Sequence, residues 1–324
     1  MFRFFCVLAA ASCLFSSAAL AEDYPGSRPI SMMMPYAAGG PGDVITRITA
    51  AGMSKYLGGT IIVENLAGAG GTIGTAKVAS STPDGHSLLL MHFGHAANMA
   101  LYAHLPYDPI KDFEPVGVVA ESPMAVVARK DFPAKDLREL VDYVKAHKDK
   151  ITYGYAGVGS ASHLCSLLFF DEVGVTVTGI PYKGTGPALT DLMGGQFDFM
   201  CDQTLNVGPA MKDGRIKGYA VTTNQRLAAF PNVPTSAEAG MPSFSITVWF
   251  GLYAPKGTPQ PVIDKLAKAL QQALQDQETQ KRLAAGGANV VPLDRATPAA
   301  LRTLLQSEVD RWVPIIKKAG VKVQ

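Results

Sequence analysis

The chain has 324 residues, of which 48% are hydrophobic and 17% are charged, and 29 Lys and Arg stand against 27 Asp and Glu. This composition is typical of an ordered globular protein and excludes an intrinsically disordered chain. The formal net charge of +2 excludes the polybasic surface with which proteins bind nucleic acid or anionic membranes.

The N-terminus has the pattern of a secretory signal peptide. One positive charge, Arg3, precedes an apolar run over Cys6–Leu20, which closes on Ala19-Leu20-Ala21. A charged start, a short apolar core and a small-x-small exit predict that residues 1–21 are removed on export to the periplasm. The run is shorter than the ~20 residues that span a bilayer. An uncleaved membrane anchor and a lipoprotein modified at Cys13 are the weaker alternatives.

Removal of residues 1–21 leaves 324 − 21 = 303 residues with a net charge of 2 − 1 = +1. A chain of this length exceeds the usual single-core domain, so two lobes are expected. Cys165 and Cys201 are the cysteines that remain after cleavage. An oxidising compartment allows them to pair, but two separate buried thiols fit the sequence equally well. Neither has metal-ligand spacing and the six histidines are scattered, so no metal or cofactor is predicted.

After the signal peptide, short apolar strands, Gly-rich turns and helices alternate. The predicted strands are Ile30–Met34, Thr60–Glu64 and Ser87–His92, and the predicted helices are Asp43–Leu57 and Thr72–Ser80. Strands that alternate with helices predict βαβ units and a mainly parallel sheet.

A second series follows a long β-rich stretch, Val116–Ala128. A helix is predicted over Asp136–His147, with Asp136 as its N-terminal cap. The further predicted elements are strand Ile151–Tyr155, helix Ala161–Asp171, strand Val175–Pro181, helix Pro187–Met193, and strands Phe197–Cys201 and Tyr219–Thr222.

The last part is a β-rich run, Ile246–Ala254, followed by helices predicted over Pro261–Ala285 and Thr297–Ala319. We interpret Val116–Ala128 and Ile246–Ala254 as two hinge crossings between lobes. The predicted domains are lobe 1, residues 22–120 with 252–324, and lobe 2, residues 121–251. A ligand site is expected in the cleft between them, because hinge closure around a ligand is a common motion of such proteins.

Three Gly-rich loops follow predicted strands and precede predicted helices: Pro35–Asp43, Gly68–Gly71 and Gly157–Ser160. In open α/β sheets, ligands bind beyond the carboxyl ends of the strands, where such loops lie. Backbone N–H groups at a helix N-terminus have no intrahelical partner and carry partial positive charge. The loops therefore predict an anion site. For any single loop, turn chemistry without a ligand is the alternative.

Side chains beside these loops add to the predicted site. Ser160 offers a hydroxyl to a carboxylate oxygen. Lys183 is the one basic residue next to a candidate loop, although an ordinary exposed turn lysine explains it as well. Tyr36, Tyr182 and Trp249 can supply apolar walls with a polar edge, and Trp249 equally fits hinge packing.

Nucleotide binding and catalysis have no support in the motifs. The dinucleotide spacing Gly-x-Gly-x-x-Gly requires glycine where Ile73 and Ser162 stand, and no phosphate-binding Gly-Lys-Ser/Thr loop is present. Ser160 and His163 are three residues apart, but no Gly-x-Ser-x-Gly elbow or orienting acid accompanies them. No catalytic residue is predicted.

Nine motifs in order carry a resemblance to a known family. They are Pro35–Asp43; Val63-Glu64-Asn65 with Gly68–Gly71; Pro83–His86; Leu105–Asp108 with Asp112-Phe113; Gly157–Ser160 with His163-Leu164; Pro181–Gly184; Asp191-Leu192 with Gly194–Gln196; Val233–Thr235 with Glu238–Gly240; and Trp249 before Ala254–Pro259. The chain resembles the Bug family of extracytoplasmic solute receptors, the TctC-like binding components of tripartite tricarboxylate transporters.

The resemblance implies a two-lobed α/β periplasmic-binding-protein fold (Venus flytrap, type II), no catalysis, and a di- or tricarboxylate or an aromatic acid as ligand. It maps the binding loops onto Tyr36–Gly40 and Gly157–Ser160 and leaves His92 and His95 to a variable set near the pocket. The residues predicted to bind the ligand are Tyr36, Ala37, Ala38, Gly39, Gly40, Asp43, His95, Gly157, Val158, Gly159, Ser160, His163, Tyr182, Lys183, Gly184, Asp202 and Trp249.

The sequence thus predicts a monomeric receptor that binds a small carboxylate and docks transiently on a membrane permease. Nucleic acid is not an expected partner. Two other classes use a similar fold: a ligand sensor that docks on a membrane kinase or regulator, and a secreted enzyme. Fold alone does not separate these functions.

Overall fold

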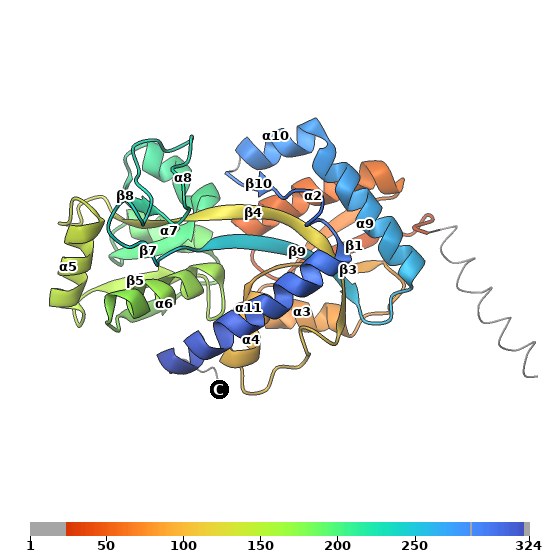
Figure 1. Ribbon diagram of the computed structural model, residues 1–324, viewed down its shortest axis with the longest axis horizontal. Helices are drawn as coiled ribbons and strands as arrows, with labels where there is room; N and C mark the ends of the chain where they lie inside the picture. The colour runs from red at the N-terminus through yellow and green to blue at the C-terminus, as the bar shows by residue number, and fades with distance from the viewer. Residues whose placement is uncertain (1–23, 286, 321–324) are drawn as a thin grey trace, which may run out of the picture.

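A computed structural model describes residues 24–285 and 287–320. The predicted signal peptide, residues 1–21, lies outside the described residues. Two lobes are joined by two long strands, and helices cover the sheet on both sides (Figure 1). None of the helices in these ranges is long and apolar enough to cross a membrane.

The strands form one mixed sheet with the order β2-β1-β3-β9-β4-β7-β5-β6, and β8 and β10 also pair with β4. Lobe 1 contains β1 to β3 and lobe 2 contains β5 to β8. The strands are β1 (Ile30–Met34), β2 (Ile61–Asn65), β3 (Ser87–His92), β4 (Phe113–Arg129), β5 (Thr152–Tyr155), β6 (Thr178–Pro181), β7 (Phe199–Gln203), β8 (Ile216–Val221), β9 (Thr247–Pro255) and β10 (Asn289–Val290).

The prediction of a mainly parallel sheet holds only at the two ends of this sheet. There, β1 pairs in parallel with β2 and β3, and β5 with β6 and β7. In the middle, β9 runs antiparallel to β3 and β4, and β4 runs antiparallel to β7 and β8. The prediction is wrong there because β4 leaves lobe 1 and β9 returns to it, so the two must run in opposite directions.

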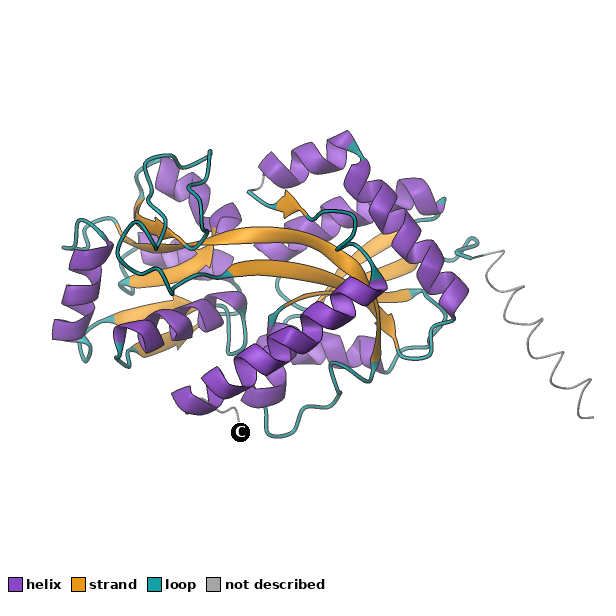
Figure 2. Cartoon of the chain, in the orientation of Figure 1, coloured by secondary structure: helices purple, strands orange, loops and turns teal. Residues whose placement is uncertain are grey.

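The two long strands lie where hinge crossings were predicted, and both run through the middle of the molecule (Figure 2). The first part of β4 pairs with β9, from Phe113 opposite Pro255 to Pro123 opposite Thr247. The rest of β4, from Met124 onward, pairs with β7 and β8. Pro123 has no N–H to donate, and it stands where β4 changes partners.

Within the described residues, eleven ranges are helical. They are α2 (Pro41–Leu57), the 3₁₀ turn η1 (Ala69–Gly71), α3 (Thr72–Ala79), α4 (Gly94–Leu101), α5 (Leu137–His147), α6 (Ala161–Val173), α7 (Thr185–Met193), α8 (Thr204–Lys212), α9 (Gln260–Gln275), α10 (Gln277–Ala285) and α11 (Pro298–Ala319). Side chains cap four of these helices. Asp136 accepts from the Glu139 N–H of α5 as predicted, Ser160 and Thr297 accept at the starts of α6 and α11, and Asp276 accepts at the start of α10.

Three helical features differ from the sequence prediction. Helices α4 and α8 were not predicted. Helix α4 has no side-chain cap that would indicate its start, and the apolar pattern of α8 is interrupted by Gly208 and Pro209. The helix predicted over Pro261–Ala285 is two helices, because Asp276 interrupts it. Its Oδ1 accepts from the N–H groups of Glu278 and Thr279 and so starts α10 afresh.

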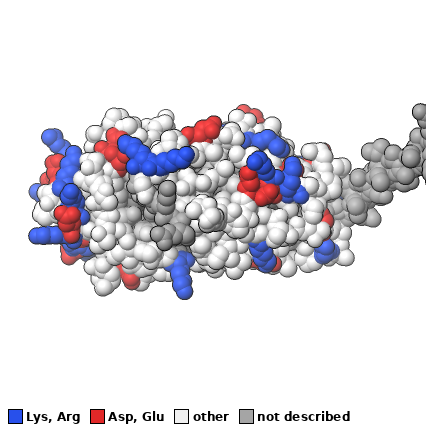
Figure 3. Space-filling model, turned by 90° about the horizontal axis from the view of Figure 1, so that it is seen from below, with Lys and Arg blue, Asp and Glu red and all other residues white. Residues whose placement is uncertain are grey.

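The C-terminal helix α11 packs on lobe 1 and reaches lobe 2. Trp312 stacks on Phe93 with ring centroids 5.4 Å apart, and Lys318 Nζ lies 2.8 Å from Asp171 Oδ1 of α6. On the face shown in Figure 3, Lys and Arg side chains lie in small groups, most of them beside Asp or Glu.

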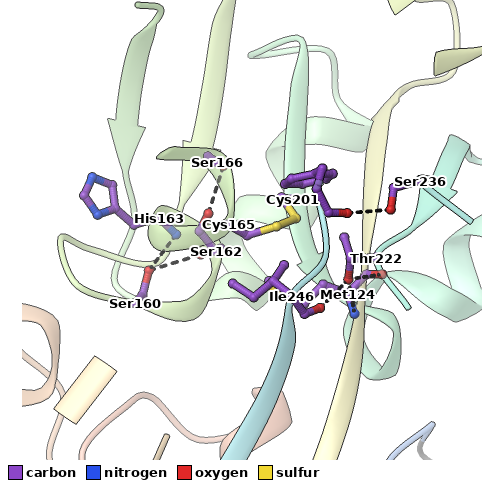
Figure 4. Close-up of a disulfide and its surroundings, with 11 residues drawn as sticks. Met124, Ser160, Ser162, His163, Cys165, Ser166, Cys201, Thr222, Ser236 and Ile246 are labelled. Atoms are coloured by element: carbon purple, nitrogen blue, oxygen red, sulfur yellow. Dashed lines mark hydrogen bonds between the residues drawn. A yellow bond between two sulfur atoms is a disulfide. The ribbon is translucent and has the colours of Figure 1, made fainter. Parts of the chain in front are cut away.

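Cys165 and Cys201 form a disulfide, with Cα atoms 5.8 Å apart, and this decides between the two alternatives that the sequence left open. The bond joins α6 to β7 (Figure 4). Both cysteines are buried. The bond therefore fixes the first turns of α6 to the end of the strand that leads into α8.

Candidate ligand-binding site

A cavity lies between the two lobes, with walls from both. The volume that the centres of water molecules can occupy in it is about 50 Å³. At ~10–15 Å³ for each water, this is room for a few of them. This small volume suits a compact ligand. Its lining residues are Tyr36, Ala37, Ala38, Gly40, Pro41, Gly42, Asp43, His92, Ala156, Ser160, Ala161, Ser162, Gly184, Thr185, Gly186, Pro187, Asp202, Gln203 and Phe250.

Three helices begin at this cavity: α2 from lobe 1, and α6 and α7 from lobe 2. Their N-terminal caps, Gly40, Ser160 and Gly184, all line it. The first N–H groups of a helix have no intrahelical partner, and the helix dipole adds partial positive charge there. No Lys or Arg is among the lining residues. An anion in the cavity would therefore be held mainly by neutral amides.

The first loop is fixed by Asp43. Its Oδ2 accepts from the Gly39 N–H at 2.9 Å and from Arg47 Nε at 3.0 Å. Burial alone would raise the pKa of Asp43, but the hydrogen bonds from Arg47 and Gly39 outweigh it and hold the pKa below its usual value. Gly39 itself has φ +82°, a conformation that glycine adopts without strain.

The lobe 2 loop is fixed by a chain of hydrogen bonds (Figure 4). Ser162 Oγ accepts from the Ala156 N–H at 3.0 Å. It also lies 3.1 Å from Ser160 Oγ, as Figure 4 shows. Ser160 Oγ also accepts from the His163 N–H at 3.3 Å. When Ser162 donates to Ser160, the Ser160 hydroxyl proton stays free. It can then be donated to a carboxylate in the cavity.

His163 supports this loop from behind. Its Nδ1 accepts from the Gly159 N–H at 3.3 Å, and its ring lies 4.6 Å from the ring of Tyr155. Burial lowers the pKa of His163 to about 4, so the ring is neutral near pH 7. His163 lines a separate hollow with Lys148 and Lys318. The structure therefore places it outside the cavity, as a positioning residue for Gly159.

His92 and His95, both predicted to lie near the pocket, have different positions in the structure. His92 lines the cavity and stacks on Tyr36 with ring centroids 5.1 Å apart. Its Nδ1 accepts from the Gly94 N–H at 2.9 Å, and burial lowers its pKa to about 3, so Nε2 carries the proton of a neutral ring. His95 does not line the cavity. It is buried among the rings of Tyr107, Phe113 and Tyr253, and burial lowers its pKa to about 3, so its ring is neutral.

The other predicted residues fall into three groups. Those that line the cavity are Tyr36, Ala37, Ala38, Gly40, Asp43, Ser160, Gly184 and Asp202. Those that line an adjoining hollow of about 310 Å³, together with Tyr36 and the Gly68–Gly71 loop, are Gly157, Tyr182 and Lys183. Those that line neither are Gly39, His95, Val158, Gly159, His163 and Trp249. Trp249 is buried in β9 opposite Glu121, which fits the hinge-packing alternative.

Sequence reasoning missed part of the site at the start of α7. Thr185, Gly186 and Pro187 line the cavity, and α7 begins at Thr185 rather than at Pro187. The sequence contains a pattern that could have identified these residues, because Gly184-Thr185-Gly186-Pro187 is a fourth Gly-rich turn before a predicted helix. Gln203, the last residue of β7, was also missed, although the neighbouring Asp202 was predicted.

The end of β7 brings acceptors to the cavity. Asp202 and Gln203 are buried, at 0% and 5% exposure. Asp202 Oδ2 accepts from Asn206 Nδ2 at 2.6 Å, whereas Asp202 Oδ1 and Gln203 Oε1 have no partner within the described residues. Burial raises the pKa of Asp202 to about 7, against the opposing hydrogen bond from Asn206. Within the described ranges, no group of His, Cys, Asp and Glu is arranged to hold a metal ion.

The lobes touch around the cavity, so the cleft is closed. Tyr102 OH of lobe 1 donates to the Val158 carbonyl oxygen of lobe 2 at 3.3 Å. Gly70 lies so close that an added Cβ would overlap this same oxygen. An added Cβ on Gly184 would lie 3.3 Å from the Cβ of Ala37. The approach of the lobes therefore depends on glycine at these contacts.

Two lobes joined by paired crossing strands, closed over a cavity at helix N-termini, define a solute receptor of the periplasmic-binding-protein class. A family model described as the tripartite tricarboxylate transporter family receptor, TctC, matches residues 45–321. The chain belongs to this family. It is a periplasmic receptor family, and its members are not enzymes.

Solved structures agree with this assignment and confirm the resemblance to Bug proteins. The periplasmic binding protein BugD has a TM-score of 0.88 and 47% identity, covering 93% of this chain and 100% of its own. MatC from Rhodopseudomonas palustris, solved with bound malate, has a TM-score of 0.87 and 42% identity, covering 90% and 100%. Another R. palustris protein, solved with adipate, has a TM-score of 0.86 and 30% identity, covering 93% and 100%.

Proposed function

We propose that this protein captures a small carboxylate in the cavity between its lobes and delivers it to a membrane transporter of the tripartite tricarboxylate type. The observation that carries the proposal is the convergence of α2, α6 and α7 from both lobes on one closed cavity. Amides from both lobes reach the ligand only in the closed state, so binding and closure favour one another. The malate and adipate bound by family neighbours support a carboxylate.

The lobes of this proposal are residues 22–120 with 252–324 and residues 121–251, and the hinge lies in β4 and β9. Residues 1–21 act as the signal peptide for export, and the mature receptor is a monomer. The ligand is held by the first turns of the three helices, with Ser160 Oγ as an additional donor. Docking on the permease requires the closed form, because only this form carries the ligand between both lobes.

The test is thermal unfolding of the mature protein, first freed of co-purified ligand, against a panel of mono-, di- and tricarboxylates and aromatic acids. A ligand that binds only the folded state, at 100 times its dissociation constant, adds ~2.7 kcal/mol to the free energy of unfolding. A selective shift with one class of acid is the expected result. If the emptied protein shifts with no acid of the panel, carboxylate binding is rejected.

The variant that tests the site is Ser160→Ala, with affinity measured by calorimetry. Loss of one hydrogen bond to a charged ligand costs about 1.5–3 kcal/mol, so the dissociation constant should rise by about tenfold or more. Ser166→Ala is the matched control, because Ser166 is on the same helix, its Oγ donates to the Ser162 carbonyl, and it does not line the cavity. Equal affinities for the two variants would contradict the assigned role of Ser160.

A further inference from the structure

The cavity has two chemically different walls. The starts of α2, α6 and α7 present N–H donors, which suit carboxylate oxygens. The end of β7 presents acceptors, namely Asp202 Oδ1 and Gln203 Oε1, and neither atom has a hydrogen-bond partner in the described part of the chain. Asp43 Oδ1, at the start of α2, is a third unpaired acceptor of a lining residue. Buried acceptors are nearly always paired in folded proteins, so three unpaired ones around one cavity indicate a donor on its occupant.

Asp202 is held so that only one of its oxygens is committed. Asn206 Nδ2 donates to Oδ2 at 2.6 Å and also lies 3.3 Å from the Thr185 carbonyl oxygen. Asp202 follows the disulfide-bonded Cys201 and is paired with Ala125 across the sheet. Its backbone is therefore fixed beside the cavity that it lines, and Oδ1 is the oxygen without a partner.

The charges at the cavity explain why a carboxylate alone is a poor partner for this wall. Asp43 is compensated by Arg47 at 3.0 Å, and the lining includes no Lys or Arg that could compensate Asp202. Burial favours the protonated form of Asp202, with a pKa of about 7. Near pH 7 both forms of Asp202 are therefore populated. The ionised form repels a carboxylate and accepts from a hydroxyl or ammonium hydrogen, and the protonated form keeps acceptor capacity beside its own O–H. A ligand with a donor thus suits both forms, whereas a carboxylate alone suits only the protonated form.

We propose that the ligand carries a hydrogen-bond donor besides its carboxylate, a hydroxyl or an ammonium group, and that Asp202 and Gln203 accept from it. The proposal rests on the proposed function, since it assigns the substrate class of the same cavity. It narrows the acids to hydroxy acids and amino acids. Asp202 thereby becomes the residue that determines specificity, because an acid without the donor leaves buried acceptors unpaired.

The test compares acids that differ only in the donor, by calorimetric titration of the emptied mature protein. The series are succinate, malate and aspartate; glutarate, 2-hydroxyglutarate and glutamate; and tricarballylate and citrate. In the series that binds, the donor-bearing acid should bind at least about tenfold tighter than its plain counterpart. Preference for the hydroxy acid identifies a hydroxyl as the donor, and preference for the amino acid identifies an ammonium group.

The variant Asp202→Asn makes the test sharper. Asn206 donates at the Oδ2 position, so the amide oxygen of the variant should take that position and leave an NH₂ group at the cavity. The acceptor becomes a donor, and the preference should fall to parity or reverse in favour of the plain acid. Asp213→Asn is the control, because it makes the same substitution at the exposed end of α8, and its preference should match that of the wild type.

Failure of this proposal differs from failure of the proposed function. If no acid in any series binds the emptied wild type, both are rejected. If plain acids bind as tightly as their donor-bearing counterparts, and Asp202→Asn leaves the ratio unchanged, the carboxylate receptor stands and the donor proposal is overturned. Circular dichroism and the unfolding midpoint of each variant establish that it is folded.

Discussion

Removing the disulfide tests how far it stabilises the part of lobe 2 that forms the site. Cys165 and Cys201 are 36 residues apart. In the chain-entropy model, a closed loop of this length restricts the unfolded chain enough to contribute about 4 kcal/mol at 25 °C. The double variant Cys165→Ala, Cys201→Ala should lose free energy of unfolding of this order. If about 300 residues unfold as one unit, the midpoint should fall by about 6 °C.

The assay is urea unfolding of the mature protein followed by circular dichroism, with and without a thiol reductant. Reductant should destabilise the wild type towards the double variant and leave the double variant unchanged. Ligand affinity should also fall, because the bond joins the helix that begins at Ser160 to the strand that ends beside Asp202 (Figure 4). A loss below about 1 kcal/mol would refute the assumption that the bond mainly restricts the unfolded chain.

Two further predictions concern closure and pH. Gly70→Ala should weaken ligand binding by about tenfold or more, because a φ of +61° strains alanine and the Val158 carbonyl leaves no space for its Cβ. In small-angle scattering, the variant should no longer contract when ligand is added. Contraction equal to that of the wild type would contradict this reasoning. The folded protein holds the Asp202 proton up to a pKa of about 7, above the unfolded value. This group should therefore lower the stability of the emptied protein as pH rises from about 4 to 7, by at most about 1.4 kcal/mol per unit. The measurement is the urea midpoint of wild type and Asp202→Asn across this pH range. The variant should lack the fall in stability that Asp202 causes, and an identical pH profile in both proteins would contradict the raised pKa of Asp202.

Local patterns in the sequence predicted much of the fold. Ile30–Met34 and Ser87–His92 have the bounds of strands β1 and β3, because short apolar runs between turns leave little choice. The direction in which strands pair depends on contacts far apart in the chain, so the antiparallel middle of the sheet was not visible. Helix α8 was missed for a local reason, since Gly208 and Pro209 break its pattern.

The loops of the site were easier to predict than its side chains. The Gly-rich turns before α2 and α6 identified two of the three helix starts, because unpaired amides follow directly from the strand-turn-helix order. His95 shows the limit of this reasoning. It is three residues from His92, yet the two rings go to different surroundings, one in the aromatic core and one at the cavity. Only the packing of α4 against its neighbours decides this.

The most direct test of the central claim is a crystal structure of the mature protein with the acid that binds most tightly. The carboxylate should lie in the cavity between the lobes, with its oxygens ~2.7–3.2 Å from amides at the starts of α6 and α7 and from Ser160 Oγ. A ligand bound elsewhere, such as in the hollow beside Lys148 and Lys318, with the cavity between the lobes filled by water alone, would contradict the account.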